Sequence, residues 1–244
     1  MAIALSGSAQ LKTALSGNLV FDSWTPGANL VAILIVAQRD EAVSIVSVTG
    51  NNLTWTLVRD KNAGRVQCGL EVWKGVGSSP TAGTTTVDNG GTLKPTSGVI
   101  QQFSGIDTTT PVEADAADTH GATDDDDMLA SVTTITANAW AVGLGVARGA
   151  VFTVPGGETA ISINQAAGAG GDLIKAHMWY QGPIATPAST QLGDLNDLGA
   201  ASDWAEVVIS LKPAAGGVTA ADGTSAGAST VSGVGGATVA SPGS

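Results

Sequence analysis

The chain has 244 residues and a formal net charge of −11, with 43% hydrophobic and only 13% charged residues. This length allows one large domain or two small ones, and the apolar content argues against wholesale disorder. The single cysteine, Cys68, excludes a disulfide framework and a cysteine-based zinc site. The 33 glycines, together with abundant Thr, Val and Ser, are typical of strands and turns and exclude an all-helical protein.

Residues 1–27 are expected to form an N-terminal arm or leading strands. The tetrapeptide Ala-Leu-Ser-Gly at positions 4–7 recurs at positions 14–17, and this spacing suits two short strands. Residues 1–14 lack a basic region followed by an apolar run, so we expect no secretory signal. Because no stretch has the roughly 18 uninterrupted apolar residues of a membrane helix, we expect synthesis in a cytoplasm and no membrane partner.

Residues 28–213 are predicted to form one domain of short strands. The apolar run Ala28–Ala37, interrupted only by Asn29, predicts a strand buried on both faces. In Ala139–Ala147, large side chains alternate with Ala and Gly, which indicates a second layer packed close to the small side. Further strands are predicted at Val43–Thr49, Leu53–Leu57, Val66–Lys74, Val99–Phe103, Ser131–Thr136, Ile161–Ile163, Leu173–Gln181 and Trp204–Lys212. Without crossover helices these strands should pair antiparallel, in an all-β sandwich or barrel.

Residues 214–244 differ sharply in composition from the rest of the chain. Ala, Gly, Ser and Thr make up 25 of these 31 residues, and the only sizeable apolar side chains are Val218, Val231, Val234 and Val239. Such a segment cannot form a core, so it is predicted to be a flexible tail. It could order as an extended chain against a partner.

Acidic residues are concentrated in the second half of the chain. Residues 1–106 hold seven Lys/Arg and six Asp/Glu, whereas residues 107–244 hold three Lys/Arg and fifteen Asp/Glu. Eight of these acids fall within residues 107–127, where we predict a solvated acidic loop. This charge disfavours nucleic acid and favours solubility or a basic protein partner. A structural Ca²⁺ or Mg²⁺ is a less favoured alternative there, because EF-hand spacing is absent.

The sequence shows no motif for catalysis. His120 falls in the predicted loop, and His177 falls on the polar face of its strand, where an exposed or edge-packed residue is the simplest interpretation and a general base the alternative. Cys68 is expected to be a buried or half-buried thiol without a reactive context. We therefore predict a protein that is not an enzyme and that has no catalytic residues, cofactor or metal site.

Six tryptophans are the most informative side chains. Buried tryptophan is common in sandwich cores, but exposed tryptophan can stack on sugars or contact a partner. Trp73, Trp179 and Trp204 lie opposite the aliphatic faces of their strands. We therefore interpret these three as facing a second surface, such as a neighbouring subunit, and name them as candidate partner contacts.

Three stretches carry a resemblance to a known domain type. They are Gly50–Val58 with Leu70–Trp73, Phe103–Asp107 with Pro111–Ala114, and Asp203–Lys212. Their order and spacing resemble a jelly-roll β-sandwich domain of tailed-phage virion proteins and prophage-like bacterial proteins. The resemblance implies a jelly-roll fold and a virion surface component, such as a capsid decoration protein, a head fibre or a tail-associated adhesin. It carries over no catalytic residue.

Three functions are compatible with these observations. The favoured one is a capsid decoration or head-spike protein, made in the host cytoplasm and located in the virion, that binds the major capsid protein or another virion protein as a homo-oligomer. The alternative is a carbohydrate-binding or host-adhesion module that uses exposed tryptophan. The least favoured is a hydrolase on a jelly-roll scaffold, since fold alone does not decide function.

Overall fold

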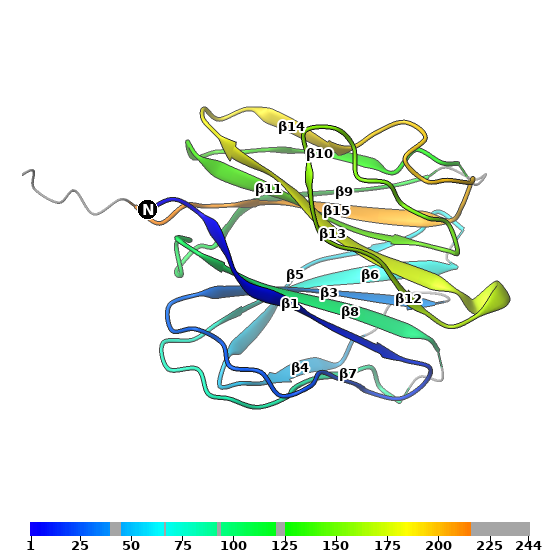
Figure 1. The fold of residues 1–244 in the computed structure, drawn as a ribbon, viewed down its shortest axis with the longest axis horizontal. Helices are drawn as coiled ribbons and strands as arrows, with labels where there is room; N and C mark the ends of the chain where they lie inside the picture. Colours follow the sequence, from blue (N-terminus) through cyan, green and yellow to red (C-terminus); the bar gives the residue numbers. More distant parts are fainter. Residues whose placement is uncertain (40–44, 66, 92–93, 121–124, 216–244) are drawn as a thin grey trace, which may run out of the picture.

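The computed structural model describes residues 1–39, 45–65, 67–91, 94–120 and 125–215. Within these ranges the regular secondary structure consists of β-strands and one turn of 3₁₀-helix at Gly170–Asp172. All the strand pairs are antiparallel. The prediction of an all-β antiparallel sandwich is confirmed (Figure 1).

The first half of the chain forms a large sheet and a small sheet. The large sheet has five strands in the order β1-β8-β3-β6-β5, and the small sheet has three in the order β2-β7-β4. This is the strand order of a jelly roll, with β5 placed at the edge of the large sheet. The strands are β1 Ala4–Ala14, β2 Leu19–Val20, β3 Val31–Arg39, β4 Ser47–Gly50, β5 Thr54–Asn62, β6 Cys68–Val76, β7 Thr85–Asp88 and β8 Thr96–Ser104.

The second half of the chain repeats this arrangement. Its large sheet has the order β12-β13-β11-β15-β9, and its small sheet pairs β10 with β14. Read across the sheet, β9, β15, β11, β13 and β12 occupy the places of β1, β8, β3, β6 and β5. The strands are β9 Val112–Thr119, β10 Leu129–Thr133, β11 Ala139–Ala147, β12 Thr159–Ala167, β13 Ile174–Ile184, β14 Ser189–Gly193 and β15 Trp204–Leu211.

Equivalent positions in the two halves hold some of the same residues. Asn29 and Asn138 stand just before the central strands β3 and β11, and both have positive φ, 58° and 63°. Trp73 on β6 lies opposite Leu34 of β3, and Trp179 on β13 lies opposite Gly143 at the same place on β11. We therefore describe the chain as two jelly-roll-like units, the first unit (residues 1–106) and the second unit (residues 107–215).

The two units stack through their large sheets, so that the molecule has four layers (Figure 1). The main core lies between the large sheets and contains Ile33 and Ile35 from β3 and Leu144 from β11. A second cluster lies between the second large sheet and the β10–β14 layer, and a third lies between the first large sheet and the β2-β7-β4 layer. Consequently β3, β11 and β15 are buried at every position, which confirms the two-sided burial predicted from the apolar run at 28–37.

Small residues on β11 allow the outer layer to approach the second large sheet. A Cβ atom on Gly145 would lie 2.8 Å from Sδ of Met128, which directly precedes β10 of the outer layer. A Cβ atom on Gly143 would lie 2.4 Å from Cε2 of Trp179 on β13, the neighbouring strand of the same sheet. The close second layer predicted from the small-residue face of this strand is confirmed. Glycine is required here because the neighbouring rings and thioether occupy the space of a side chain.

Several elements differ from the sequence prediction. Residues 1–27 form two leading strands, β1 and β2, but β1 is longer than the repeated tetrapeptide suggested and pairs with β8, so the sandwich begins at Ala4 and not at residue 28. Within the predicted acidic loop, residues 112–119 form the edge strand β9. Its Ala and Asp content gives low strand propensity, and pairing with β15 decides its conformation. The short strands β7 and β14 were also missed.

The contact between Gly143 and Trp179 generates a stability prediction. Replacing Gly143 with Ala should lower the free energy of unfolding by about 1–3 kcal/mol, because the added methyl group overpacks the interface with the Trp179 ring. The matched control is Gly156→Ala, since a Cβ there meets no atom within 4 Å. Urea unfolding followed by tryptophan fluorescence measures both variants, and equal stabilities would contradict the packing argument.

Candidate functional site

The three tryptophans named as candidate partner contacts lie in two environments. Trp73 is half-buried on the first unit, and its Nε1 donates a 2.8 Å hydrogen bond to Oε2 of Glu71. Trp179 is fully buried and Trp204 is 3% exposed. Both pack under the β10–β14 layer, so the second surface that covers them belongs to the chain itself. Among the three, only Trp73 keeps substantial side-chain surface open to solvent.

His120 and Asp203 form a buried pair at one end of the sandwich. Nε2 of His120 contacts Oδ1 of Asp203, and both side chains are 0% exposed. The Asp203 carboxylate also accepts hydrogen bonds from the backbone N–H groups of Arg65 at 3.0 Å and Gln67 at 2.8 Å. A carboxylate that orients a histidine is part of many hydrolase sites, so this pair is the strongest candidate for catalysis that the structure assembles.

The surroundings of this pair indicate a structural role. Sγ of Cys68 donates to the backbone oxygen of Asp203 at 3.4 Å, and Cys68 itself belongs to the main core. The ring of Trp204 tilts against His120 at a centroid distance of 6.2 Å. Because Arg65 belongs to the first unit and Asp203 to the second, the carboxylate ties the two units together. Sequence reasoning missed Asp203, because nothing in its sequence context marks it as a hydrogen-bond acceptor for a distant loop.

Removing this carboxylate should destabilise the protein strongly. Asp203→Ala leaves a buried histidine and two backbone N–H groups without their acceptor, which should cost about 3–5 kcal/mol of unfolding free energy. The control is Asp22→Ala, because the Asp22 side chain is 82% exposed and its ion pair with Lys12 lies on the surface. Chemical denaturation compares the two variants. If Asp203→Ala lowered the unfolding free energy by less than about 1 kcal/mol, the role of this carboxylate in joining the two units would be contradicted.

His177 lies in a polar row that crosses the second large sheet. His177 on β13 and Glu206 on β15 both lie opposite Gly145 on β11, so their side chains share the outer face. Nδ1 of His177 accepts a 3.1 Å hydrogen bond from the backbone N–H of Asn164. Burial, and then the charge of Lys175, lower the pKa of His177 to about 3, so the imidazole is neutral. The sequence interpretation of an exposed or edge-packed residue is wrong, because the second layer covers this face.

Three carboxyl groups, from Glu158, Asp197 and Glu206, influence one another beneath the β10–β14 layer. Glu206 is fully buried, and neither carboxyl oxygen has a hydrogen-bond partner among the described residues. Burial, reinforced by Asp197, Glu158 and Asp118, raises the pKa of Glu206 far above its ordinary value. Burial also raises the pKa of Glu158 to about 7 and that of Asp197 to about 6. This cluster therefore holds protons near neutral pH.

The carboxyl cluster predicts stability that falls as pH rises. The folded state holds more carboxyl protons than the unfolded state between the ordinary pKa near 4 and the raised values, so the free energy of unfolding decreases with pH. Above about pH 7 His177 is neutral in both states and does not contribute. Between about pH 7 and 8.5, we expect the free energy of unfolding to fall by up to roughly 1.4 kcal/mol per pH unit for each carboxyl proton that the folded state holds and the unfolded state does not.

Glu206→Gln tests the source of this pH dependence. The amide cannot ionise, so the variant should be more stable than the parent at about pH 8 and should show a shallower decline. Asp22→Asn is the control, because that carboxyl group is exposed and should leave the slope unchanged. Thermal unfolding at a series of pH values measures both, and an unchanged slope in Glu206→Gln would assign the decline to other groups.

The predicted acidic loop of residues 107–127 is partly structured. Asp115 on β9 forms a 3.0 Å ion pair with Arg59 of the first unit, and Asp107 forms a 2.8 Å ion pair with Lys212. Residues 121–124, which include Asp124, lie outside the described residues. In the ranges that the structure covers, no group of three or more His, Cys, Asp or Glu side chains is arranged to hold a metal ion.

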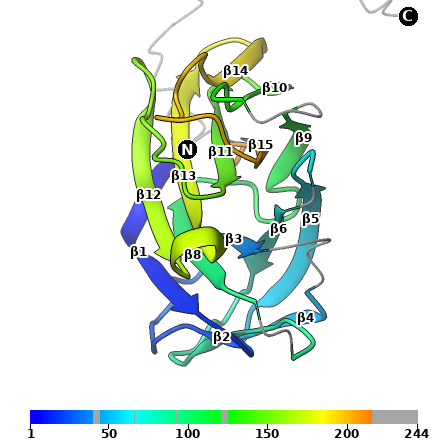
Figure 2. The ribbon, with the colours of Figure 1, turned by 90° about the vertical axis from the view of Figure 1, so that its right-hand side faces the viewer.

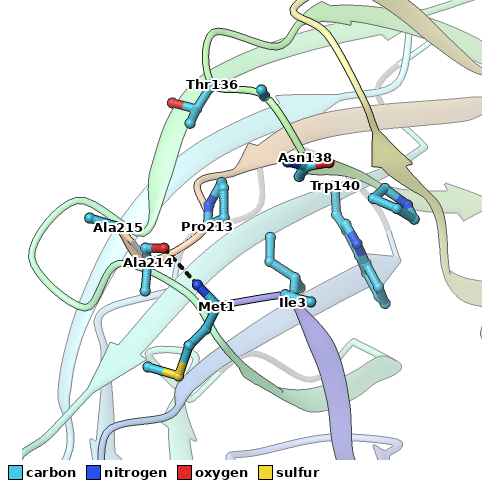
Figure 3. A pocket seen from close by; sticks show the side chains of 11 residues that line it. Met1, Ile3, Thr136, Asn138, Trp140, Pro213, Ala214 and Ala215 are labelled. Atoms are coloured by element: carbon cyan, nitrogen blue, oxygen red, sulfur yellow. Dashed lines mark hydrogen bonds between the residues drawn. The ribbon is translucent and has the colours of Figure 1, made fainter. Parts of the chain in front are cut away.

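An apolar groove of about 670 Å³ opens where the first residues of the chain lie beside residues 213–215 (Figure 3). Its walls include Met1, Ile3, Trp140 and Pro183, with Asn138 at the rim. The amino group of Met1 donates a 3.1 Å hydrogen bond to the backbone oxygen of Ala214, so these two segments together form one wall. No pattern in the sequence predicts this groove, because residues from four distant segments build it.

No family model matches this chain. No curated protein and no solved structure matches it either. In the part of the chain that the structure describes, no helix is long and apolar enough to cross a membrane.

Proposed function

We propose that this protein is a structural virion component of a tailed phage, namely a capsid decoration or head-spike protein that binds the shell in multiple copies. The sequence resemblance described above motivates the proposal. The observation that carries it is the separation of charge between the two stacked units. Residues 1–106 carry seven basic and six acidic residues, whereas residues 107–215 carry three basic and fourteen acidic residues.

Because the units are stacked as layers, this separation gives the molecule two unlike outer faces (Figure 2). The near-neutral face is the outside of the β2-β7-β4 layer. There Val20, Thr86 and Thr49 align across the three strands and point outward, since the neighbouring row Leu19, Val87 and Val48 is buried. A surface of small uncharged side chains can dock on a protein shell without removing charges from water. The acidic second unit then faces solvent and keeps the particle soluble.

The described groups that resemble catalytic residues are consistent with a binding protein. His120, His177 and Cys68 are all buried among structural contacts. The Gly/Ala/Ser/Thr-rich residues 214–244 offer a second attachment besides the folded body. Two weak attachments on one chain raise the effective concentration of each, and many copies resist dissociation without any chemistry.

The proposal is tested by mixing purified protein with undecorated capsids and measuring bound copies per particle. We expect saturable binding, and we expect the double variant Val20→Arg, Thr49→Arg to bind about tenfold more weakly or worse. Leu195→Arg is the matched control, because Leu195 is 61% exposed on the acidic unit. Loss of binding in Leu195→Arg alone would show that the acidic unit contacts the shell.

A glycan array separates this function from adhesion. Trp73 is the candidate stacking residue because it is half-buried and lies on the same sheet face as Trp55 of the neighbouring strand. Tight glycan binding that Trp73→Ala abolishes, together with no capsid binding, would replace the decoration proposal with the adhesion module.

A further inference from the structure

The two long edges of the sandwich differ in charge. One edge is formed by β5 and β9, which end the two large sheets on one side, and the opposite edge is formed by β1 and β12 (Figure 2). Strands β5 and β9 are nine and eight residues long and hold three charged residues each. Strands β1 and β12 are 11 and nine residues long and hold one charged residue between them, Lys12. Charged side chains keep a sheet edge from pairing with another chain, so the β5–β9 edge has this protection and the β1–β12 edge lacks it.

The gap between the two large sheets is also closed differently at the two edges. At the β5–β9 edge, Arg59 and Asp115 form a 3.0 Å ion pair from one sheet to the other. At the β1–β12 edge, Leu11 of β1 lies opposite Val99, a residue of the main core, so Leu11 faces the second large sheet and yet is 44% exposed. Ile163 of β12 is 37% exposed. Apolar side chains therefore remain open to solvent along this edge.

Strand β1 offers a regular backbone edge for part of its length. In the described ranges it pairs with β8 alone and ends its sheet. A bulge interrupts this pairing between Ser6 and Gln10. There Nε2 of Gln101 donates to the backbone oxygens of Ser6 and Gly7, at 3.3 and 3.4 Å. From Gln10 to Ala14 the register with β8 is regular, so alternate backbone N–H and C=O groups of this stretch point away from the sheet.

We propose that the β1–β12 edge is an interface between two copies of this chain, in which β1 of one copy pairs antiparallel with β1 of the other. The chain carries a net charge of −11, so two copies repel each other least where their uncharged edges meet. The charge of Lys12 is compensated by a 2.7 Å ion pair with Asp22 of the same copy. A two-fold axis along the stacking direction of the layers pairs β1 with β1 and brings the β12 edges together as well. The contact joins the outward backbone groups and covers Leu11 and Ile163.

This symmetry gives the dimer two unlike sides. The first unit lies at one end of the stack of layers and the second unit at the other (Figure 1). A two-fold axis along the stack leaves this order the same in both copies, so both β2-β7-β4 layers face one side and both acidic units face the other. The dimer therefore presents two equal near-neutral faces to a shell. Self-association itself does not depend on the proposed function, because the purified protein shows it without any capsid.

Sedimentation equilibrium of the purified full chain measures the assembly. We expect a particle of about twice the 24.0 kDa chain mass. Leu11→Lys brings two like charges together at the interface and should weaken the dimer about tenfold or more. Leu57→Lys is the matched control, because Leu57 is 43% exposed on the β5 edge of the same sheet, and it should leave the dimer unchanged. A monomeric parent at about 100 µM, or equal weakening by the two substitutions, would overturn the proposal.

Spin labels on introduced cysteines locate the interface. Thr13→Cys labels β1 and Thr56→Cys labels β5, since both threonines are exposed on edge strands of the same sheet. Cys68 is buried and should stay unlabelled. From the spacings within and between strands, the two Thr13 labels should lie within about 30 Å of each other, and the two Thr56 labels about 40 Å or more apart. Pulsed dipolar spectroscopy measures both distances. The reverse order would place the interface at the β5–β9 edge, and either that result or no coupling between Thr13 labels would overturn the proposal.

Discussion

The structure depends on burying both faces of its two large sheets. A sheet buried on both sides needs apolar or very small side chains at nearly every position of its central strands, and β3, β11 and β15 meet this requirement. Each sheet then needs two covering layers. One is the other large sheet, and the other is a small sheet from the same unit. The four-layer body follows from this requirement, as do the glycines that admit Trp179 and Met128.

Internal repetition explains how one chain supplies all four layers. Each unit is a jelly roll with the same strand order, and the units pack large sheet against large sheet. The two units share their strand order but differ in charge. The first unit is nearly neutral and the second is strongly acidic.

The buried polar groups join the two units and affect the stability of the fold. Asp203 joins loops of both units through backbone N–H groups and His120. Glu206 and its neighbouring carboxyl groups sit under the outermost layer without enough donors to hold a negative charge, so they retain protons. The carboxyl cluster therefore makes the stability of the fold sensitive to alkaline pH.

Sequence patterns alone determined the strand content, the antiparallel pairing and the two-sided burial of the central strands. These features follow from local alternation, glycine-rich turns and the run of apolar residues at 28–37, which act at short range. The edge strand β9 was not predictable, because its Ala and Asp residues adopt strand geometry only when β15 pairs with them.

The burial of Trp179, Trp204 and His177 likewise depended on a covering layer from a distant part of the chain. The repeat was invisible because the two units share topology and few residues, and the groove was invisible because four separate segments build it. Alternating side chains along a strand show that its two faces differ. Only the tertiary structure decides whether a face contacts solvent, a partner or another part of the same chain.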